Sequence, residues 1–213
     1  MQVVSLEGVE KSYHGRAILS GVDLQIDAGS AVGIQGENGS GKSVLLKIIT
    51  RLVLPDAGQV TIADRYLKKG RVFPEGFGVL IDRPGYIPGQ TGLQNLMSLA
   101  HILNVVTESK VRETMILVGL DPDLPQKAKH YSLGMKQRLG LAQAIMEDQA
   151  VLILDEPFNA LDEESVIEMR KVFRSLVDDG RTLVMTSHQR DDLSIVCDRS
   201  YTIKHGRLEP ASR

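Results

Sequence analysis

The sequence has few of the features that mark secreted, membrane-spanning or nucleic-acid-binding proteins. Its one cysteine, Cys197, excludes an internal disulfide and is typical of a reducing compartment. No apolar run approaches the roughly 18 residues that span a bilayer, and residues 1–7 do not form a secretory signal. The formal net charge of -2 offers no basic face to a nucleic acid. We therefore expect a cytoplasmic protein that binds no nucleic acid.

The composition is otherwise ordinary for a globular protein. Hydrophobic residues make up 42% of the chain and charged residues 24%, so a sizeable core can form. The 213 residues suffice for one large domain or for one domain with a subdomain. No internal repeat or low-complexity segment divides the chain.

One segment near the N-terminus matches the phosphate-binding pattern G-x-x-x-x-G-K-[S/T]. Its glycines let several backbone N–H groups approach one polyphosphate, which side chains would obstruct. Lys42 can place its charge on the β- and γ-phosphates, and the Ser43 hydroxyl can ligate Mg2+. A strand is predicted at residues 31–35 and a helix at 44–49, so the positive end of the helix would face the phosphates. The predicted nucleotide-binding residues here are Gly36, Glu37, Asn38, Gly39, Ser40, Gly41, Lys42, Ser43 and Val44.

Two adjacent carboxylates follow the apolar run at residues 151–154, which is typical of a strand buried on both faces of a parallel sheet. Charges at the end of a buried strand are costly unless they bind something. Asp155 can hold Mg2+ directly or through water, and Glu156 can orient a water molecule. The alternative is that these acids only cap the next element.

Residues 93–145 have the periodicity of helices. The third of these predicted helices begins at Ser132 and Gly134, which makes its start a second potential anion-binding terminus. That signal is weak alone, because many helices begin after serine or glycine. Thr107 can cap the second helix. The apolar residues of the first helix share one face, which indicates core packing rather than a cofactor or membrane contact: Leu93, Leu96, Met97 and Ala100.

Further candidates lie next to predicted strands. Tyr13 precedes the phosphate-binding segment by a short β segment, and its ring can stack on adenine, although a half-buried strand tyrosine is an equally good interpretation. Asp162 can cap a helix that leads to a predicted strand at residues 182–186. His188 follows this strand, where ligands bind in open α/β sheets, but a lone histidine is more often a surface residue.

Taken together, these motifs resemble the nucleotide-binding subunit of ATP-binding cassette (ABC) transporters over essentially the whole chain. That family has, in this order, an aromatic adenine stacker, a phosphate loop, a glutamine loop, a signature sequence, a buried strand with Asp-Glu, an Ala-Leu-Asp loop and a switch histidine. The resemblance strengthens three candidates that are weak alone, namely Tyr13, Ser132 and His188. The seven features correspond to Tyr13, residues 36–43, the region of Asp82, residues 131–135, Asp155 with Glu156, residues 160–162 and His188.

The signature departs from the usual Leu-Ser-Gly-Gly-Gln and reads Tyr-Ser-Leu-Gly-Met at residues 131–135. It keeps the serine and the second glycine, which in the family face the γ-phosphate of the partner's ATP. The partner-site residues that the resemblance implies are Ser132, Leu133, Gly134 and Met135.

The usual glutamine after the predicted strand at residues 77–81 is replaced by Asp82. An ionised carboxylate can bind Mg2+ but cannot donate a hydrogen bond to the attacking water. Gln90 lies further on, inside a Pro/Gly-rich loop, and we do not take it as a substitute. Both departures resemble the drug- and antibiotic-resistance exporters of the family.

The resemblance implies an α/β fold with a P-loop NTPase (RecA-like) core and a mostly parallel sheet. An N-terminal antiparallel β subdomain and an inserted α-helical subdomain would complete it. Residues 1–213 would form a single ATPase domain. Residues 1–85 and 146–213 would make the β subdomain and the core, and residues 86–145 the helical subdomain.

For function, the resemblance implies an ATPase subunit that drives substrate movement through a separate integral membrane permease. Two subunits, in a homodimer or pseudo-homodimer, would each hold ATP between one phosphate loop and the Ser132 helix start of the other. Glu156 would act on water and His188 would contact the γ-phosphate. The residues implied to bind Mg2+ are Ser43, Asp82 and Asp155. The subunit would lie peripherally on the inner face of the cell membrane.

Two other functions are alternatives to this one. A soluble ABC-type ATPase would serve DNA repair, translation or cofactor assembly. The chain lacks sustained coiled-coil heptads and a second cassette, so cofactor assembly is the open alternative. A regulatory nucleotide-binding module without turnover is disfavoured by Glu156 and His188.

Overall fold

The computed structural model describes residues 1–211, in which the strands form two separate sheets. The first sheet is antiparallel and has the order β2-β1-β4. A turn at residues 14–15 joins its two long strands. Its strands are β1 (Gln2–Tyr13), β2 (Arg16–Asp27) and β4 (Ala57–Ile62).

The second sheet has the order β5-β6-β7-β3-β8-β9. Its neighbouring strands pair in parallel, except that β8 and β9 form an antiparallel hairpin. The predicted combination of a mostly parallel sheet with a separate antiparallel one is therefore confirmed. The strands are β3 (Ala31–Gln35), β5 (Phe77–Leu80), β6 (Val151–Leu154), β7 (Thr182–Thr186), β8 (Arg199–Lys204) and β9 (Arg207–Pro210).

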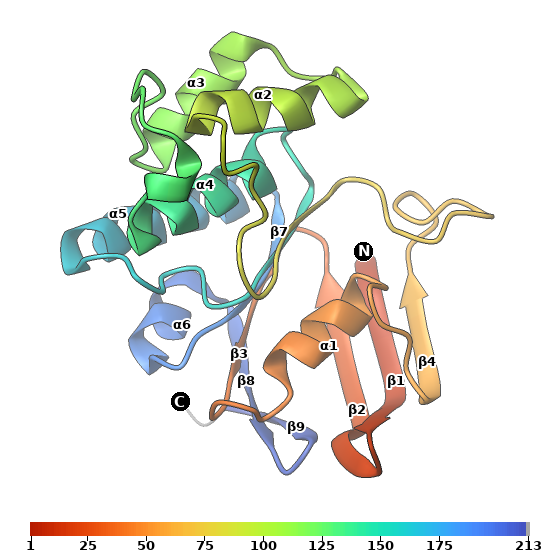
Figure 1. Cartoon of the computed structure of the whole chain (residues 1–213). Helices are drawn as coiled ribbons and strands as arrows, with labels where there is room; N and C mark the ends of the chain where they lie inside the picture. The colour runs from red at the N-terminus through yellow and green to blue at the C-terminus, as the bar shows by residue number, and fades with distance from the viewer. Residues whose placement is uncertain (212–213) are drawn as a thin grey trace.

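The helices fall into two groups in space (Figure 1). α1 lies beside the antiparallel sheet, whereas α2 and α3 lie on α4 at the top of the view. Within residues 1–211, no helix combines the length and the apolar character needed to cross a membrane. The helices are α1 (Lys42–Ile49), α2 (Gly92–Leu103), α3 (Glu108–Leu117), the 3-10 turn η1 (Ala128–His130), α4 (Leu133–Ile145), α5 (Glu163–Asp178) and α6 (Arg190–Val196).

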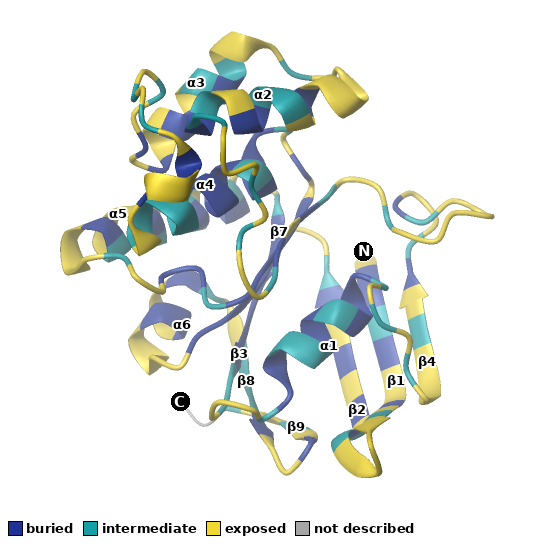
Figure 2. Ribbon diagram, in the orientation of Figure 1, coloured by how far each residue is buried: buried dark blue, intermediate teal, exposed yellow. Residues whose placement is uncertain are grey.

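The six-stranded sheet separates two hydrophobic clusters, and β6 contributes to both. Leu152 and Leu154 pack in the cluster that includes residues of α2 to α6, whereas Val151 and Ile153 pack with α1 and the antiparallel sheet. All four side chains are buried, and Figure 2 shows that buried residues gather in the strands at the centre of the molecule. Successive strand residues point to opposite faces, so β6 is a strand buried on both faces, as predicted.

Side-chain caps determine where several helices begin. The Thr91 hydroxyl accepts a hydrogen bond from the Gln94 N–H, and the Gln94 side chain accepts one from the Thr91 N–H, which forms a capping box. The predicted caps Thr107 and Asp162, and Ser132 at the third predicted helix start, each accept a backbone N–H three residues later. These contacts confirm the predicted helix starts.

Candidate functional site

The site lies at the carboxyl ends of three neighbouring parallel strands. The strand order places β3 beside β7 and β7 beside β6. The phosphate-binding segment follows β3, Asp155 and Glu156 follow β6, and His188 follows β7. Carboxyl ends of parallel strands meet at one sheet edge, so segments far apart in sequence converge here.

The phosphate-binding segment turns tightly from β3 into α1. Gly39 and Gly41 have φ values of 79° and 107°, which residues with a side chain rarely adopt. Gly41 is also the N-cap of α1, so no side chain stands between the helix N-terminus and a ligand. The buried Lys42 amine donates to the carbonyl oxygens of Gly36, at 2.8 Å, and of Glu37, at 3.2 Å. These bonds fix the ammonium group within the loop.

Ser43 and Asp155 meet at the end of β6. The Ser43 hydroxyl donates to Asp155 Oδ2 at 2.5 Å, and the Thr186 hydroxyl donates to Asp155 Oδ1 at 2.6 Å. Asp155 is buried, and both of its carboxylate oxygens have a partner. The arrangement offers adjacent oxygen atoms of the kind that Mg2+ prefers.

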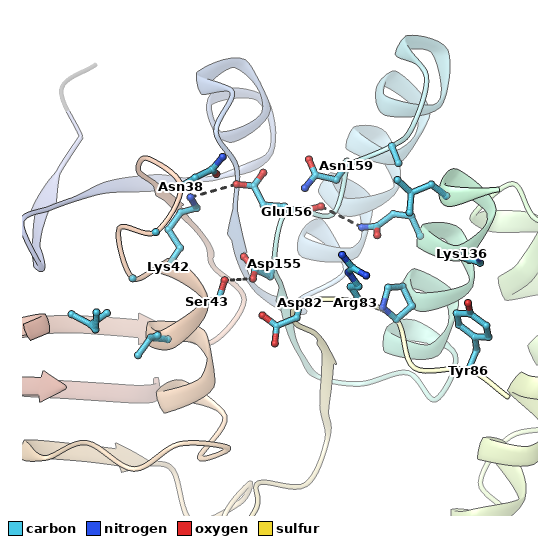
Figure 3. A pocket seen from close by; sticks show the side chains of 18 of the residues that line it. Asn38, Lys42, Ser43, Asp82, Arg83, Tyr86, Lys136, Asp155, Glu156 and Asn159 are labelled. Atoms are coloured by element: carbon cyan, nitrogen blue, oxygen red, sulfur yellow. Dashed lines mark hydrogen bonds and ion pairs between the residues drawn. The ribbon is translucent and has the colours of Figure 1, made fainter. Parts of the chain in front are cut away.

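The Glu156 carboxylate lies between two groups that can carry positive charge. Its Oε1 is 3.6 Å from the Lys42 amine (Figure 3). Its Oε2 is 3.0 Å from His188 Nδ1. The Glu156 N–H donates to the Thr186 hydroxyl at 2.8 Å. The backbone of Glu156 has a φ of 48°, in the left-handed region that glutamate rarely adopts. Contacts with α1 and with the residue beyond the end of β7 therefore hold this carboxylate in place.

Two adjoining cavities, of about 720 Å³ and 650 Å³, flank the phosphate-binding segment. The larger cavity is lined by both Tyr13, which is 42% exposed, and Glu156. The predicted residues that line the larger cavity are Tyr13, Asn38, Gly39, Gly41, Lys42, Ser43, Val44, Asp82, Leu133, Asp155 and Glu156. Those that line the smaller one are Gly36, Glu37, Asn38, Gly39 and Ser40.

The start of α4 differs from the rest of the predicted set. Ser132 is exposed, and its hydroxyl accepts the Met135 N–H at 3.1 Å. Leu133 lines the larger cavity and is 72% exposed. Ser132, Gly134 and Met135 do not line this cavity. The structure of one protomer thus does not bring the Ser132 hydroxyl together with Lys42 and Glu156.

Asp82 lies just after β5, at the edge of the larger cavity. Its carboxylate forms an ion pair with the Lys47 amine of α1 at 2.7 Å, and its backbone φ is 62°. The pair links the loop after β5 to the helix that carries Lys42 and Ser43.

Sequence reasoning missed several side chains around the cavity. Thr186 is the last residue of β7, and its position beside the end of β6 was available only from the strand order. Gln137 lies one helical turn after Gly134, and its amide contacts the backbone of Glu156 and Pro157. The other missed residues that line the cavity are Ile18, Arg83, Pro84, Tyr86, Lys136 and Asn159.

Comparison with known proteins gives one consistent family. A protein-family model described as "ABC transporter" matches residues 19–159. The uncharacterized ABC transporter ATP-binding protein YybJ of Bacillus subtilis (strain 168) is 32% identical, over 99% of this chain and 97% of its own length. The bacitracin transport ATP-binding protein BcrA of Enterococcus faecalis is 32% identical, over 97% of this chain and 68% of its own length.

Solved structures agree with the sequence matches. The dimeric structure of MJ0796, a bacterial ABC transporter cassette, has a TM-score of 0.85 and 26% identity, and covers 97% of this chain and 96% of that chain. A dimeric post-hydrolysis state of the same cassette, bound to ADP and Pi, has a TM-score of 0.84 and 25% identity over the same shares. The resemblance expected from the motifs is confirmed, and the chain belongs to the ABC transporter family, as an ATP-binding subunit that hydrolyses ATP.

Proposed function

We propose that Mg2+ and ATP bind in the larger cavity, with the adenine on Tyr13 and the phosphates on the segment from Gly36 to Val44. The observation that carries this proposal is the convergence of Lys42, Glu156 and His188 at one sheet edge. The Lys42 amine and the N-terminus of α1 supply positive charge for the β- and γ-phosphates. The side chains that reach this edge suit hydrolysis of a terminal phosphate.

The Ser43 hydroxyl and the Asp155 carboxylate fit Mg2+. Both residues line the larger cavity and offer oxygen ligands, and Mg2+ in nucleotide sites takes one or two protein oxygens and completes its shell with phosphates and water. No group of three or more His, Cys, Asp or Glu side chains in residues 1–211 could hold a metal ion alone, in keeping with a site that needs the nucleotide. When bound, Mg2+ would neutralise charge on the phosphates. Asp82 would bind the Mg2+ only if its ion pair with Lys47 were broken.

Glu156 is the residue that we assign to the attacking water. A carboxylate at the end of a buried strand can orient the water and accept its proton. His188 holds Glu156 Oε2 at 3.0 Å and, as an exposed side chain beyond β7, can turn its other ring nitrogen to the γ-phosphate. The two residues thus form one unit next to Lys42.

A second copy of the chain would complete each site. The exposed Ser132 and Leu133 lie at an outward-facing helix start, which presents backbone N–H groups to an anion. In a head-to-tail dimer with two-fold symmetry, the two α4 starts would close over the two nucleotides in identical sites. ATP would hold the halves together, and hydrolysis would release them.

A membrane permease is the partner that we propose for the helical layer. Several large apolar side chains are exposed around the Pro/Gly-rich loop and the helix that follows it, and contiguous exposed apolar surface is typical of a protein contact. Docking there would place the subunit at the inner face of the cell membrane. The exposed side chains are Ile87, Leu99, Ile102, Leu103 and Val105.

The same layer corresponds to the division that we propose within the chain. Residues 86–145 would form the helical subdomain that binds the permease. Residues 1–85 and 146–213 would form the β subdomain and the nucleotide-binding core. Capture of a multi-span membrane protein on the full chain, lost on Ile102→Glu, would support this assignment, whereas recovery of the chain only in the cytosolic fraction would favour the cofactor-assembly alternative.

The transported substrate is inferred only by analogy. BcrA is named for bacitracin transport, and the lantibiotic transport protein SrtF of Streptococcus pyogenes is 31% identical over 97% of this chain and 89% of its own length. We infer that this subunit serves the export of a peptide antibiotic or a related drug. Its departures at Leu133 and Asp82 agree with that branch.

Replacing Glu156 tests the assignment of the hydrolytic group. Glu156→Gln keeps the size of the side chain but removes the base, so we expect ATP to bind normally and turnover to fall about 10²–10⁴-fold. Phosphate release and the binding of a fluorescent ATP analogue would be measured on the same preparation. Turnover near the wild-type rate would refute the assignment.

A further inference from the structure

α4 makes a series of contacts with the segment that follows β6. A Cβ atom at Gly134 would lie 2.7 Å from the Ala160 carbonyl oxygen, so the helix start packs directly on this segment. The Arg138 guanidinium donates to the Ser165 hydroxyl and lies 3.9 Å from the Asp162 carboxylate. The helix that begins at Ser132 therefore contacts the C-terminal end of the segment from Glu156 to Asp162.

Gln137 binds the same segment at its N-terminal end. Its amide nitrogen donates to the carbonyl oxygen of Glu156 at 3.2 Å and to that of Pro157 at 3.0 Å. The Asn159 N–H also donates to the Glu156 carbonyl, at 3.1 Å. On the other side of the residue, the Glu156 N–H is bound to Thr186. The N–H and the carbonyl group of Glu156 are thus both hydrogen-bonded.

These hydrogen bonds hold a backbone conformation that is unfavourable for glutamate. Glu156 has a φ of 48°, and a residue with a side chain keeps this conformation only where the surroundings enforce it. Relaxation of φ would swing the carboxylate away from Lys42 and His188, because the side chain leaves the backbone at the same Cα. Of the groups that bind the Glu156 carbonyl, Gln137 is the one on α4.

We propose that Gln137 is a positioning residue, which holds the Glu156 peptide in its left-handed conformation and thereby aims the carboxylate at the attacking water. This inference rests on the proposed role of Glu156. It also has a consequence for the dimer, since α4 carries Ser132 at its tip and Gln137 little more than one turn later. Contact of the tip with the partner's nucleotide is transmitted to the carboxylate of the helix's own site.

The test replaces the amide by a thioether of similar length. Gln137→Met cannot donate to either carbonyl, and a misdirected reacting group costs up to about 10²-fold in rate. We expect kcat to fall about 10–100-fold while the Kd for ATP stays within about twofold. The matched control is Gln143→Met, because Gln143 is also a half-buried glutamine of α4 and its amide donates to the Gly85 carbonyl at 2.8 Å, away from Glu156. Its kcat should stay at the wild-type value.

The Glu156→Gln background separates positioning from a general structural role. Without the carboxylate there is nothing to aim, so Gln137→Met should leave the residual turnover unchanged. Wild-type kcat in Gln137→Met, or an equal further loss in the double variant, would overturn the proposal. Wild-type turnover in Glu156→Gln alone would instead overturn the role of Glu156. If Gln137→Met shows no cooperative thermal unfolding, Gln137→Ala is measured in the same way and decides.

Discussion

The N-termini of α1 and α4 look alike in sequence but lie in opposite surroundings. Serine and glycine residues precede α1 and span the start of α4, and both helix starts are predicted to bind anions. At α1, Lys42 is buried and Ser43 is bound to Asp155, so each side chain has its partner within the protomer. At α4, the Ser132 hydroxyl caps its own helix and Leu133 is 72% exposed.

This difference indicates that the two helix starts have different roles in a nucleotide site. The α1 start is set in a framework of β3, β6 and β7, and we propose that this framework positions the ligands of the phosphates and of Mg2+. The α4 start is ordered by its cap but directed outward, as expected of a surface that meets a second molecule. We propose that these two helix starts are complementary halves of one site, each supplied by a different copy of the chain.

We expect the largest effect on ATP binding from a substitution at the start of α1. Lys42→Ala removes the ammonium group that we place on the phosphates, and loss of a charged hydrogen-bonding partner costs about 1.5–3 kcal/mol. We expect the Kd for ATP to rise roughly 10–100-fold, as measured by calorimetry. Lys171→Ala, on the exposed surface of α5, is the control and should bind ATP normally. Unchanged affinity in Lys42→Ala would show that the cavity is not the nucleotide site.

A smaller effect should follow from loss of the α4 cap. Ser132→Ala removes the acceptor for the Met135 N–H, and loss of a serine cap costs about 0.5–2 kcal/mol. For a chain of this size the melting temperature should fall by roughly 2–4 °C per kcal/mol, as measured by calorimetry or circular dichroism. Because the cap acts within the protomer, ATP binding to the monomer should not change. An unchanged melting temperature would mean that the cap does not stabilise α4.

Much of the fold was predictable because its signals are local. The run at residues 151–154 predicted a doubly buried strand, and Thr107, Ser132 and Asp162 marked helix starts through contacts three residues away. The phosphate-binding segment was predictable for the same reason, since its glycines and Lys42 act within one turn.

The remaining parts of the site depend on contacts between segments that are distant in sequence. Thr186 reaches Asp155 only because β6 and β7 are neighbours, and Gln137 reaches Glu156 only because α4 packs on the segment after β6. The Lys47–Asp82 ion pair is likewise set by the packing of α1 against the loop after β5. Periodicity predicts which face of a helix is apolar, but it does not say which polar side chain will meet which strand end.

The most direct test of the two-halves account is the mass of the ATP-bound species in solution. Sedimentation of Glu156→Gln with ATP should show a dimer, and adding Ser132→Arg should leave a monomer that binds ATP with the affinity of the Glu156→Gln monomer. A dimer that persists with arginine at the α4 tip, or a monomer that loses ATP as Lys42→Ala does, would contradict the assignment of that tip to the site of a second copy.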